Sequence, residues 1–186
     1  MVKFHSQHYR NIANDCISIV SDILNKHDIE WTIGYGTLLG CIRDGSYIPH
    51  DRDVDFEVYN ASIDDIIKIK EEISKHIPFE TLRKYKDTYY LLAFRIEGMR
   101  VDLHLWKDCG DCYCRFEGKN IPKKFYKIRK HDKIVKKIFN GIEINIPYPP
   151  DRYLSDIYGE DWMICKSKWY TIDDSPAVRN IEEYKW

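Results

Sequence analysis

The sequence predicts an α+β fold in which a mixed, largely antiparallel sheet is flanked by helices. An amphipathic helix is expected over residues 6–28, where apolar side chains recur at helical spacing. Three strand candidates then follow one another at 79–85, 89–96 and 100–106, separated only by short turns. Such short connections join antiparallel strands, whereas parallel strands need long crossovers, so a doubly wound parallel sheet is disfavoured.

The remaining elements of the first half alternate between strand and helix. A short strand is expected at 31–34, followed by a short helix at 36–43 that the turn around Gly45 closes. Side chains alternate as in a strand over 53–59. A second helix is expected over 62–76, where acidic residues in the first turn favour the positive end of the helix dipole.

The second half carries weaker signals. Residues 109–117 form a polar, cysteine-containing segment, and 122–140 is basic and predicted to be partly helical. Alternation returns over 142–146, and a short helix is expected at 152–158 before an irregular end of the chain. The sequence contains neither an internal repeat nor a low-complexity linker, so a single domain over 1–186 is predicted.

Composition excludes several classes of protein. The formal net charge of -1 is unlike that of a polybasic nucleic-acid binder, and no nucleic-acid partner is expected. Apolar runs fall well short of the ~20 residues that a membrane-spanning helix needs, and the N-terminus lacks the apolar run of a signal peptide. We therefore expect a soluble, cytoplasmic chain without a membrane segment, with its six cysteines reduced.

Three aspartates form the most informative pattern. Asp53 and Asp55 lie two apart in a strand, so their carboxylates project from the same face. Asp102 lies in a later strand, on the opposite face from its apolar neighbours. If the two strands are adjacent, three carboxylates meet, and hard oxygen ligands of this kind suit Mg²⁺ or Mn²⁺. Such a site can align a hydroxyl and stabilise charge on a phosphoryl group.

The aspartates have two other interpretations. Acidic strand ends are often only solvated, and spacing alone does not separate that case from a metal site. An EF-hand loop also begins with alternating aspartates, but it needs glycine at the sixth position and glutamate at the twelfth. Counted from Asp51, those positions hold Phe56 and Ser62, so the EF-hand is excluded.

A glycine-rich turn precedes the aspartates. Gly34, Gly36 and Gly40 lie between the predicted strand and helix, where backbone amides can approach a phosphate. Thr37 adds a hydroxyl, and Arg43 can reach the same anion with its guanidinium. A tight turn without any ligand is the alternative. A dinucleotide-binding turn is disfavoured because the glycine spacing differs and the downstream acids form a pair suited to metal.

The segment from Gly34 to Val58 resembles the signature of the LicD/fukutin-related family. It reads GYGTLLGCIRDGSYIPHDRDVDFEV. The matching positions are Gly36, Thr37, Leu38, Leu39, Gly40, Arg43, Gly45, Ile48, Pro49, Asp51, Asp53 and Asp55. Val101-Asp102 resembles the family's third aspartate strand, and 149–163 resembles its C-terminal block. Two positions depart from the pattern: His50 stands where Trp is usual, and Arg52 replaces an acid.

The resemblance implies a nucleotidyltransferase fold and a definite reaction. A phospho-alditol or phosphocholine group would pass from a CDP-linked donor to a glycan acceptor, with Asp53, Asp55 and Asp102 as catalytic and metal-binding residues. Asp53 and Asp55 would hold Mg²⁺ (or Mn²⁺) against the donor pyrophosphate. Asp102 would share a second ion or accept the acceptor's proton. The substrate-binding residues would be Gly36, Thr37 and Arg43, contacting phosphate or offsetting its charge. Arg52, which departs from the family pattern, could also contact donor phosphate or merely pair with an acid.

The cysteines suggest a second metal site. Cys109, Cys112 and Cys114 are clustered, and with His104, Cys165 or another ligand they could supply the four ligands of structural Zn²⁺. Some fukutin-related proteins carry zinc, but unpaired thiols in a loop are the preferred interpretation. Cys16 and Cys41 fall on helical stripes and are predicted to be core.

Aromatic and basic residues near the C-terminus have two interpretations each. Tyr158, Trp162 and Trp169 could stack on a cytosine base, although packing is favoured for the two tryptophans. The basic run from Lys123 to Lys137 could attract a phosphorylated acceptor, but a solvated face is favoured.

Two other functions compete with CDP-donor transfer. The first is transfer of a nucleotide from an NTP, against which the Gly-Thr pair argues, since such enzymes usually place serine after the glycine. The second is a non-catalytic domain that binds nucleotide or glycan, against which the three retained aspartates argue.

Overall fold

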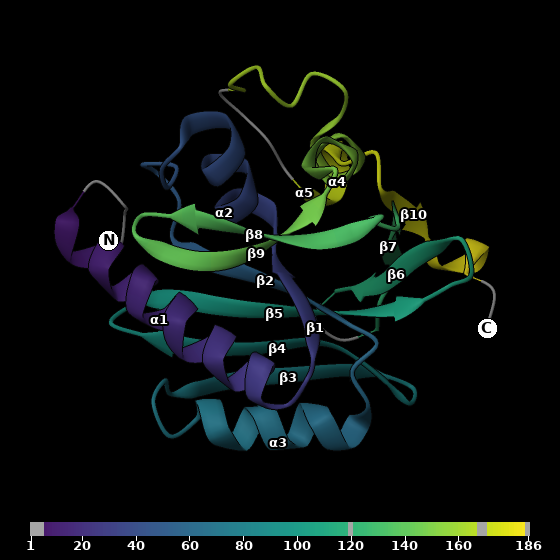
Figure 1. The fold of residues 1–186 in the computed structure, drawn as a ribbon. Coiled ribbons are helices and arrows are strands. Elements are labelled where there is room, and N and C mark those ends of the chain that lie inside the picture. The colour runs from purple at the N-terminus through teal and green to yellow at the C-terminus, as the bar shows by residue number, and fades with distance from the viewer. Residues whose placement is uncertain (1–5, 119–120, 167–170, 185–186) are drawn as a thin grey trace.

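The predicted α+β class and largely antiparallel sheet are confirmed by the computed structural model, which describes residues 6–118, 121–166 and 171–184 (Figure 1). The helices are α1 (Gln7–Lys26), α2 (Tyr35–Leu39), α3 (Ile63–Ile73), α4 (Pro150–Tyr158) and α5 (Thr171–Asp174). The strands are β1 (Glu30–Ile33), β2 (Asp53–Tyr59), β3 (Phe79–Tyr85), β4 (Thr88–Ile96), β5 (Met99–Asp108), β6 (Cys112–Glu117), β7 (Lys124–Arg129), β8 (Lys133–Phe139), β9 (Ile142–Tyr148) and β10 (Val178–Asn180). A wider π-type turn, Gly40–Asp44, continues α2, and a short 3-10 turn spans Ile181–Glu183.

One strand organises the sheet. β5 pairs in parallel with β2 on one side and antiparallel with β4 on the other, which gives the order β1-β2-β5-β4-β3. The last residues of β5 then pair with β6, and the sheet continues through β7 to β10. The pairing of β2 with β5 is the one parallel pair in the described part of the chain. It joins the two strands that carry the predicted aspartates.

The two predicted long helices form and pack together. Ser6 caps α1 by accepting the Tyr9 N–H, and the apolar stripe of α1 is buried. Ser62 and Asp65 form a capping box that begins α3. α1 lies across β1, β2 and β5 and contacts both α3 and β9 of the β8–β9 hairpin (Figure 1). The helices therefore hold β2 and β5 in a rigid frame.

Three predictions for the second half are wrong. Residues 122–140 are not partly helical but form β7 and β8, and the supposed polar excursion at 109–117 contains β6. The end of the chain contains α5, β10 and the 3-10 turn rather than only irregular structure. In each case long-range pairing decides the conformation: β6 pairs with β7, and β8 with β9. Frequent lysines obscure the local alternation, so pattern alone could not reveal these strands.

Other predictions for side-chain placement are confirmed. Cys16 and Cys41 are buried in the core. Of the basic run, Lys127, Lys133, Lys136 and Lys137 are exposed, as expected for a solvated face. None of the helices in the described ranges combines the length and the apolar character that crossing a bilayer requires.

Candidate active site

The parallel pairing of β2 with β5 places the predicted aspartates on neighbouring strands. In the strand register Asp55 lies opposite Asp102, and Glu57 lies opposite His104. Side chains two apart on a strand share a face, so both pairs project to the same side of the sheet. The expectation that the third aspartate's strand lies beside the first two aspartates is therefore confirmed.

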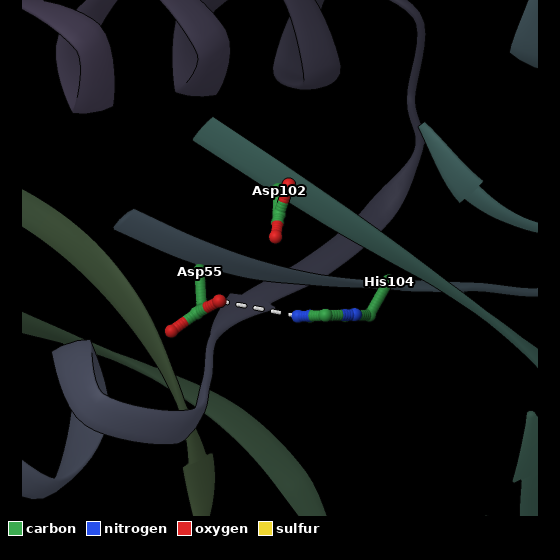
Figure 2. A group of neighbouring side chains, drawn as sticks. All are labelled: Asp55, Asp102 and His104. Carbon is green, nitrogen blue, oxygen red and sulfur yellow. Dashed lines mark hydrogen bonds and ion pairs between the residues drawn. The ribbon is translucent and has the colours of Figure 1, made fainter. Parts of the chain in front are cut away.

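Asp55, Asp102 and His104 point toward one another from these two strands (Figure 2). One ligand atom from each side chain lies within 4.8 Å of the others. The His104 Nε2 is 3.1 Å from Asp55 Oδ1 and donates a hydrogen bond to it when it carries the proton. All three side chains are buried, with exposed fractions of 6%, 6% and 9%. Among the described residues this is the one such group of three potential metal ligands.

Two further carboxylates extend the negative charge outward. Half-buried Asp51 and Asp53 line, with Asp55 and Asp102, a cavity of about 580 Å³. Burial and then the charge of Asp53 raise the pKa of Asp51 well above its ordinary value. The pKa of Asp55 is also raised, first by burial and then by the charges of Asp53 and Asp102. Repulsion on this scale is what a divalent cation between the carboxylates would relieve.

Asp102 has an unsatisfied oxygen. Arg100 Nε lies 3.0 Å from Asp102 Oδ1, but the pair lacks hydrogen-bond geometry and this oxygen has no hydrogen-bond partner among the described residues. Burial raises the pKa of Asp102 to about 7, against the lowering effect of Arg100. A buried carboxylate oxygen without a partner is costly, and a bound cation would satisfy it. The chemistry of the donor set therefore fits a divalent metal ion.

The glycine turn gives its residues different roles. Gly36 lines the cavity, and a Cβ built there would lie 2.1 Å from Asp51 Oδ2, so glycine allows the carboxylate to approach. Thr37 is buried, and its Oγ1 accepts the Asp55 N–H at 3.0 Å. Thr37 is not among the residues that line the cavity, and its contact with phosphate stays a prediction. It holds β2 in place beneath the site.

The two predicted arginines also differ. Arg43 lines the cavity, where its guanidinium donates two hydrogen bonds of 2.8 Å to Asp44. Arg52 is exposed and is not among the residues that line the cavity, and its contact with donor phosphate stays a prediction. It lies between Asp51 and Asp53, which face the cavity, and alternation in extended backbone turns Arg52 away.

Arg115 is a site residue that sequence reasoning missed. It lies on β6, lines the cavity and is 4% exposed. Its Nη2 donates to Tyr35 Oη at 2.7 Å, and its Nη1 pairs with Glu117 at 3.0 Å. The Tyr126 ring lies 4.7 Å from the guanidinium carbon, a cation–π contact. The available signal was the alternation of Cys112, Cys114 and Phe116, which gives β6 one apolar face and places Arg115 on the other.

A buried network connects the site to α4. Glu57 is fully buried, accepts a 2.6 Å hydrogen bond from Tyr153 Oη and accepts another from Trp106 Nε1. Tyr153 Oη in turn accepts the Tyr35 N–H at 3.2 Å. Tyr35 has a positive φ of 38°, and its ring centroid is 4.6 Å from that of His104. Helix α4 therefore helps to fix the ring that packs against the metal-ligand candidate.

The cysteines stay apart from this group. Cys112 and Cys114 are buried on β6, and half-buried Cys109 contacts Tyr184 Oη at 3.9 Å. Hydrogen bonding from Cys114 lowers the pKa of Cys109 to about 7. Neither suggested fourth zinc ligand is placed with the cysteines, since His104 faces the carboxylates and exposed Cys165 lines the cavity. Zinc binding by Cys109, Cys112 and Cys114 stays a prediction.

The aromatic residues of the C-terminal block border the cavity. Tyr158 and Trp162 are partly buried against the core and also line the cavity. Packing of these two rings against the core is thus compatible with stacking on a base in the cavity. Trp169 lies outside the described residues.

The raised pKa values predict how the stability of the metal-free protein depends on pH. Both Asp102 and Glu57 have pKa values of about 7, above their ordinary 3.8 and 4.5. The folded state binds these protons more tightly than the unfolded state does. Their stabilising contribution is therefore complete below about pH 4 and is lost as the pH rises through about 7. Denaturant unfolding in EDTA should show this loss.

Asp102→Asn is the comparison that isolates the effect. It should reduce the pH dependence between about pH 5 and pH 8 to the part that Glu57 contributes, and added divalent cation should stabilise the wild-type protein more at the higher pH, where protons no longer compete. Equal slopes for wild type and variant would contradict the assignment. Far-UV circular dichroism provides the check that the variant is folded.

Comparison with known proteins supports the fold and identifies the family. The solution structure of the antibiotic-resistance factor ANT(2'')-Ia aligns with a TM-score of 0.51 at 12% identity, covering 84% of this chain and 76% of that chain. An antigenic nucleotidyltransferase-like protein from Paracoccidioides brasiliensis aligns at 0.43 with 15% identity, covering 78% and 64%. No curated protein sequence matches the chain.

The family model described as LicD/FKTN/FKRP, nucleotidyltransferase domain, matches residues 28–148. This range is more than half of the chain and includes all three aspartates. The chain therefore belongs to the LicD/FKTN/FKRP family, and its sheet has the nucleotidyltransferase fold.

Proposed function

We propose that this protein is a metal-dependent phosphotransferase that moves a phospho-alditol or phosphocholine group from a CDP-activated donor to a glycan hydroxyl. Membership of the family supports a transferase. The observation that carries the proposal is the register of β2 and β5, which sets Asp55 directly opposite Asp102 in the wall of one cavity. That arrangement is suited to a divalent ion between two strands, and half-buried Asp53 lines the same cavity.

The residues of the chain have distinct roles in this proposal. Asp53, Asp55 and Asp102 would hold the divalent cation, which when bound neutralises charge on the donor phosphates. The acceptor hydroxyl oxygen forms the new bond to phosphorus as the bond to the CMP oxygen breaks, and the hydroxyl proton must leave. Asp102 would accept that proton as general base in the alternative in which its carboxylate is not occupied by the ion.

Polar and aromatic groups in the wall support donor binding. Arg43 and the backbone at Gly36 both line the cavity beside the acidic residues, where the donor phosphates would lie. Arg115 adds a buried positive charge beneath them. Tyr158 and Trp162 offer rings on which a nucleobase can stack. The cavity thus combines an acidic centre with cationic and aromatic walls.

The test is a donor screen with mass analysis of the product. Purified protein is incubated with CDP-choline, CDP-ribitol, CDP-glycerol or an NTP and a panel of simple glycans, with divalent cation or with EDTA. We expect cation-dependent release of CMP from one CDP-linked donor and a glycan whose mass gains a phospho-alditol or phosphocholine group. A gain of NMP from an NTP would instead support nucleotide transfer. Nucleotide binding that ignores the cation, without any product, would indicate a binding domain.

A further inference from the structure

We propose that His104 is a nitrogen ligand of the metal site, so that the site prefers transition-metal ions such as Mn²⁺ over Mg²⁺. The inference rests on the metal site of the proposed function, and it is independent of the donor and the acceptor. The sequence pattern predicts only carboxylates around the ion and suggests His104 only as a zinc ligand beside the cysteines. The structure instead brings its imidazole between two strands that carry aspartates.

The geometry of His104 matches that of a ligand. Its Nε2 is 3.1 Å from Asp55 Oδ1. Two donors that bind one ion at about 2.1 Å and at right angles lie about 3.0 Å apart, so this separation needs little adjustment. The donor atoms of Asp55, Asp102 and His104 converge within 4.8 Å of one another. Figure 2 shows all three side chains directed into the same space.

One buried atom supports an ion at this point. Asp102 Oδ1 forms an ion pair with Arg100 Nε at 3.0 Å but has no hydrogen-bond partner among the described residues, although its side chain is buried. The His104 Nε2 that faces it is bonded only to Asp55 in the described ranges. Buried polar atoms are normally satisfied, and an unsatisfied oxygen beside an imidazole indicates a missing cation. The Tyr35 ring, 4.6 Å away, holds the imidazole in this orientation.

The donor set determines which ion is preferred. Carboxylate and water oxygens suit Mg²⁺, whereas imidazole binds later divalent metals more strongly, in the order from Mn²⁺ toward Cu²⁺. A site made of aspartates alone lacks an imidazole nitrogen and would not gain this preference for Mn²⁺. Adding one imidazole to the aspartate carboxylates should therefore shift the preference away from Mg²⁺.

The experiment measures the ligand directly with Mn²⁺ as a paramagnetic probe. Electron spin echo envelope modulation of the whole chain with Mn²⁺ should show a coupled imidazole nitrogen. Labelling histidine with ¹⁵N should change that signal in the wild-type chain, without any substitution. His104→Gln, which replaces the nitrogen by an oxygen donor, should abolish it. Competition between Mn²⁺ and Mg²⁺ should then show a Mn²⁺ preference reduced about tenfold or more.

His50→Gln is the matched control. His50 also lines the cavity but is exposed, and it should keep the nitrogen signal. Circular dichroism confirms that each variant is folded. Bound Mn²⁺ without a histidine nitrogen in the wild-type protein would overturn the assignment of His104 and leave the proposed transfer untouched. A histidine nitrogen without any transfer would support His104 while the proposed function fails. Absence of Mn²⁺ binding would contradict both.

Discussion

Asp55→Asn is expected to reduce metal-dependent transfer at least about a thousandfold without destabilising the fold. Asp55 lies opposite Asp102 and is repelled by its charge and by that of Asp53. Removing one of these buried charges relieves repulsion in the metal-free protein. The asparagine Oδ1 can still accept the hydrogen bond of His104 Nε2. Activity should therefore fall while the thermal midpoint in EDTA stays level or rises.

Two measurements separate this functional effect from a structural one. The stabilisation of the wild-type protein by divalent cation should be lost in Asp55→Asn, because a ligand has been removed. Asp64→Asn is the matched control, since Asp64 is exposed in the first turn of α3. It should keep both turnover and cation-induced stabilisation. Full turnover in Asp55→Asn with added cation would remove the proposed role of this aspartate.

Gly34→Ala is expected to destabilise the protein by about 3 kcal/mol or more, or to prevent folding. A Cβ at Gly34 would lie 1.9 Å from Glu57 Oε1 and 2.5 Å from its carboxyl carbon. Glu57 cannot move away easily, because Tyr153 and Trp106 both hold its carboxylate. The backbone of Gly34 is itself fixed by a 3.0 Å hydrogen bond to the Asp55 carbonyl. The clash is therefore between the Gly34 backbone and the Glu57 carboxylate, and neither can move away easily.

Gly45→Ala provides the control for loss of a glycine alone. Gly45 has a φ of 66°, and a Cβ added there would meet no atom within 4 Å, so alanine introduces only backbone strain, costing about 1 kcal/mol. Denaturant unfolding should rank the two variants in this order. Glu57→Ala in the Gly34→Ala background should recover part of the loss by removing the clashing carboxylate. Equal destabilisation by both glycine substitutions would show that close packing at Gly34 is unimportant.

The sequence pattern correctly predicted those features whose physical cause lies in neighbouring residues. The helical period of the first helix, the Ser62 cap of α3 and the alternation around Asp53 and Asp55 each depend on neighbouring residues. The spacing of two between Asp53 and Asp55 determines that they share a face, whatever strand lies beside them. The same applies to Asp102 and His104 on β5. These features could be derived from the sequence by itself.

The pairing of strands that lie far apart in the sequence was decided only by the tertiary structure. Spacing on β2 does not determine that β5 lies beside it in parallel, with Asp55 opposite Asp102 and His104 within reach. The sequence could not show that Arg115 on β6 lines the cavity. Nor could it show that the Thr37 hydroxyl accepts a hydrogen bond from the β2 backbone at Asp55. The physical reason is that chain periodicity fixes the face on which a side chain lies. Contacts between distant segments depend instead on the packing of the whole sheet and its helices.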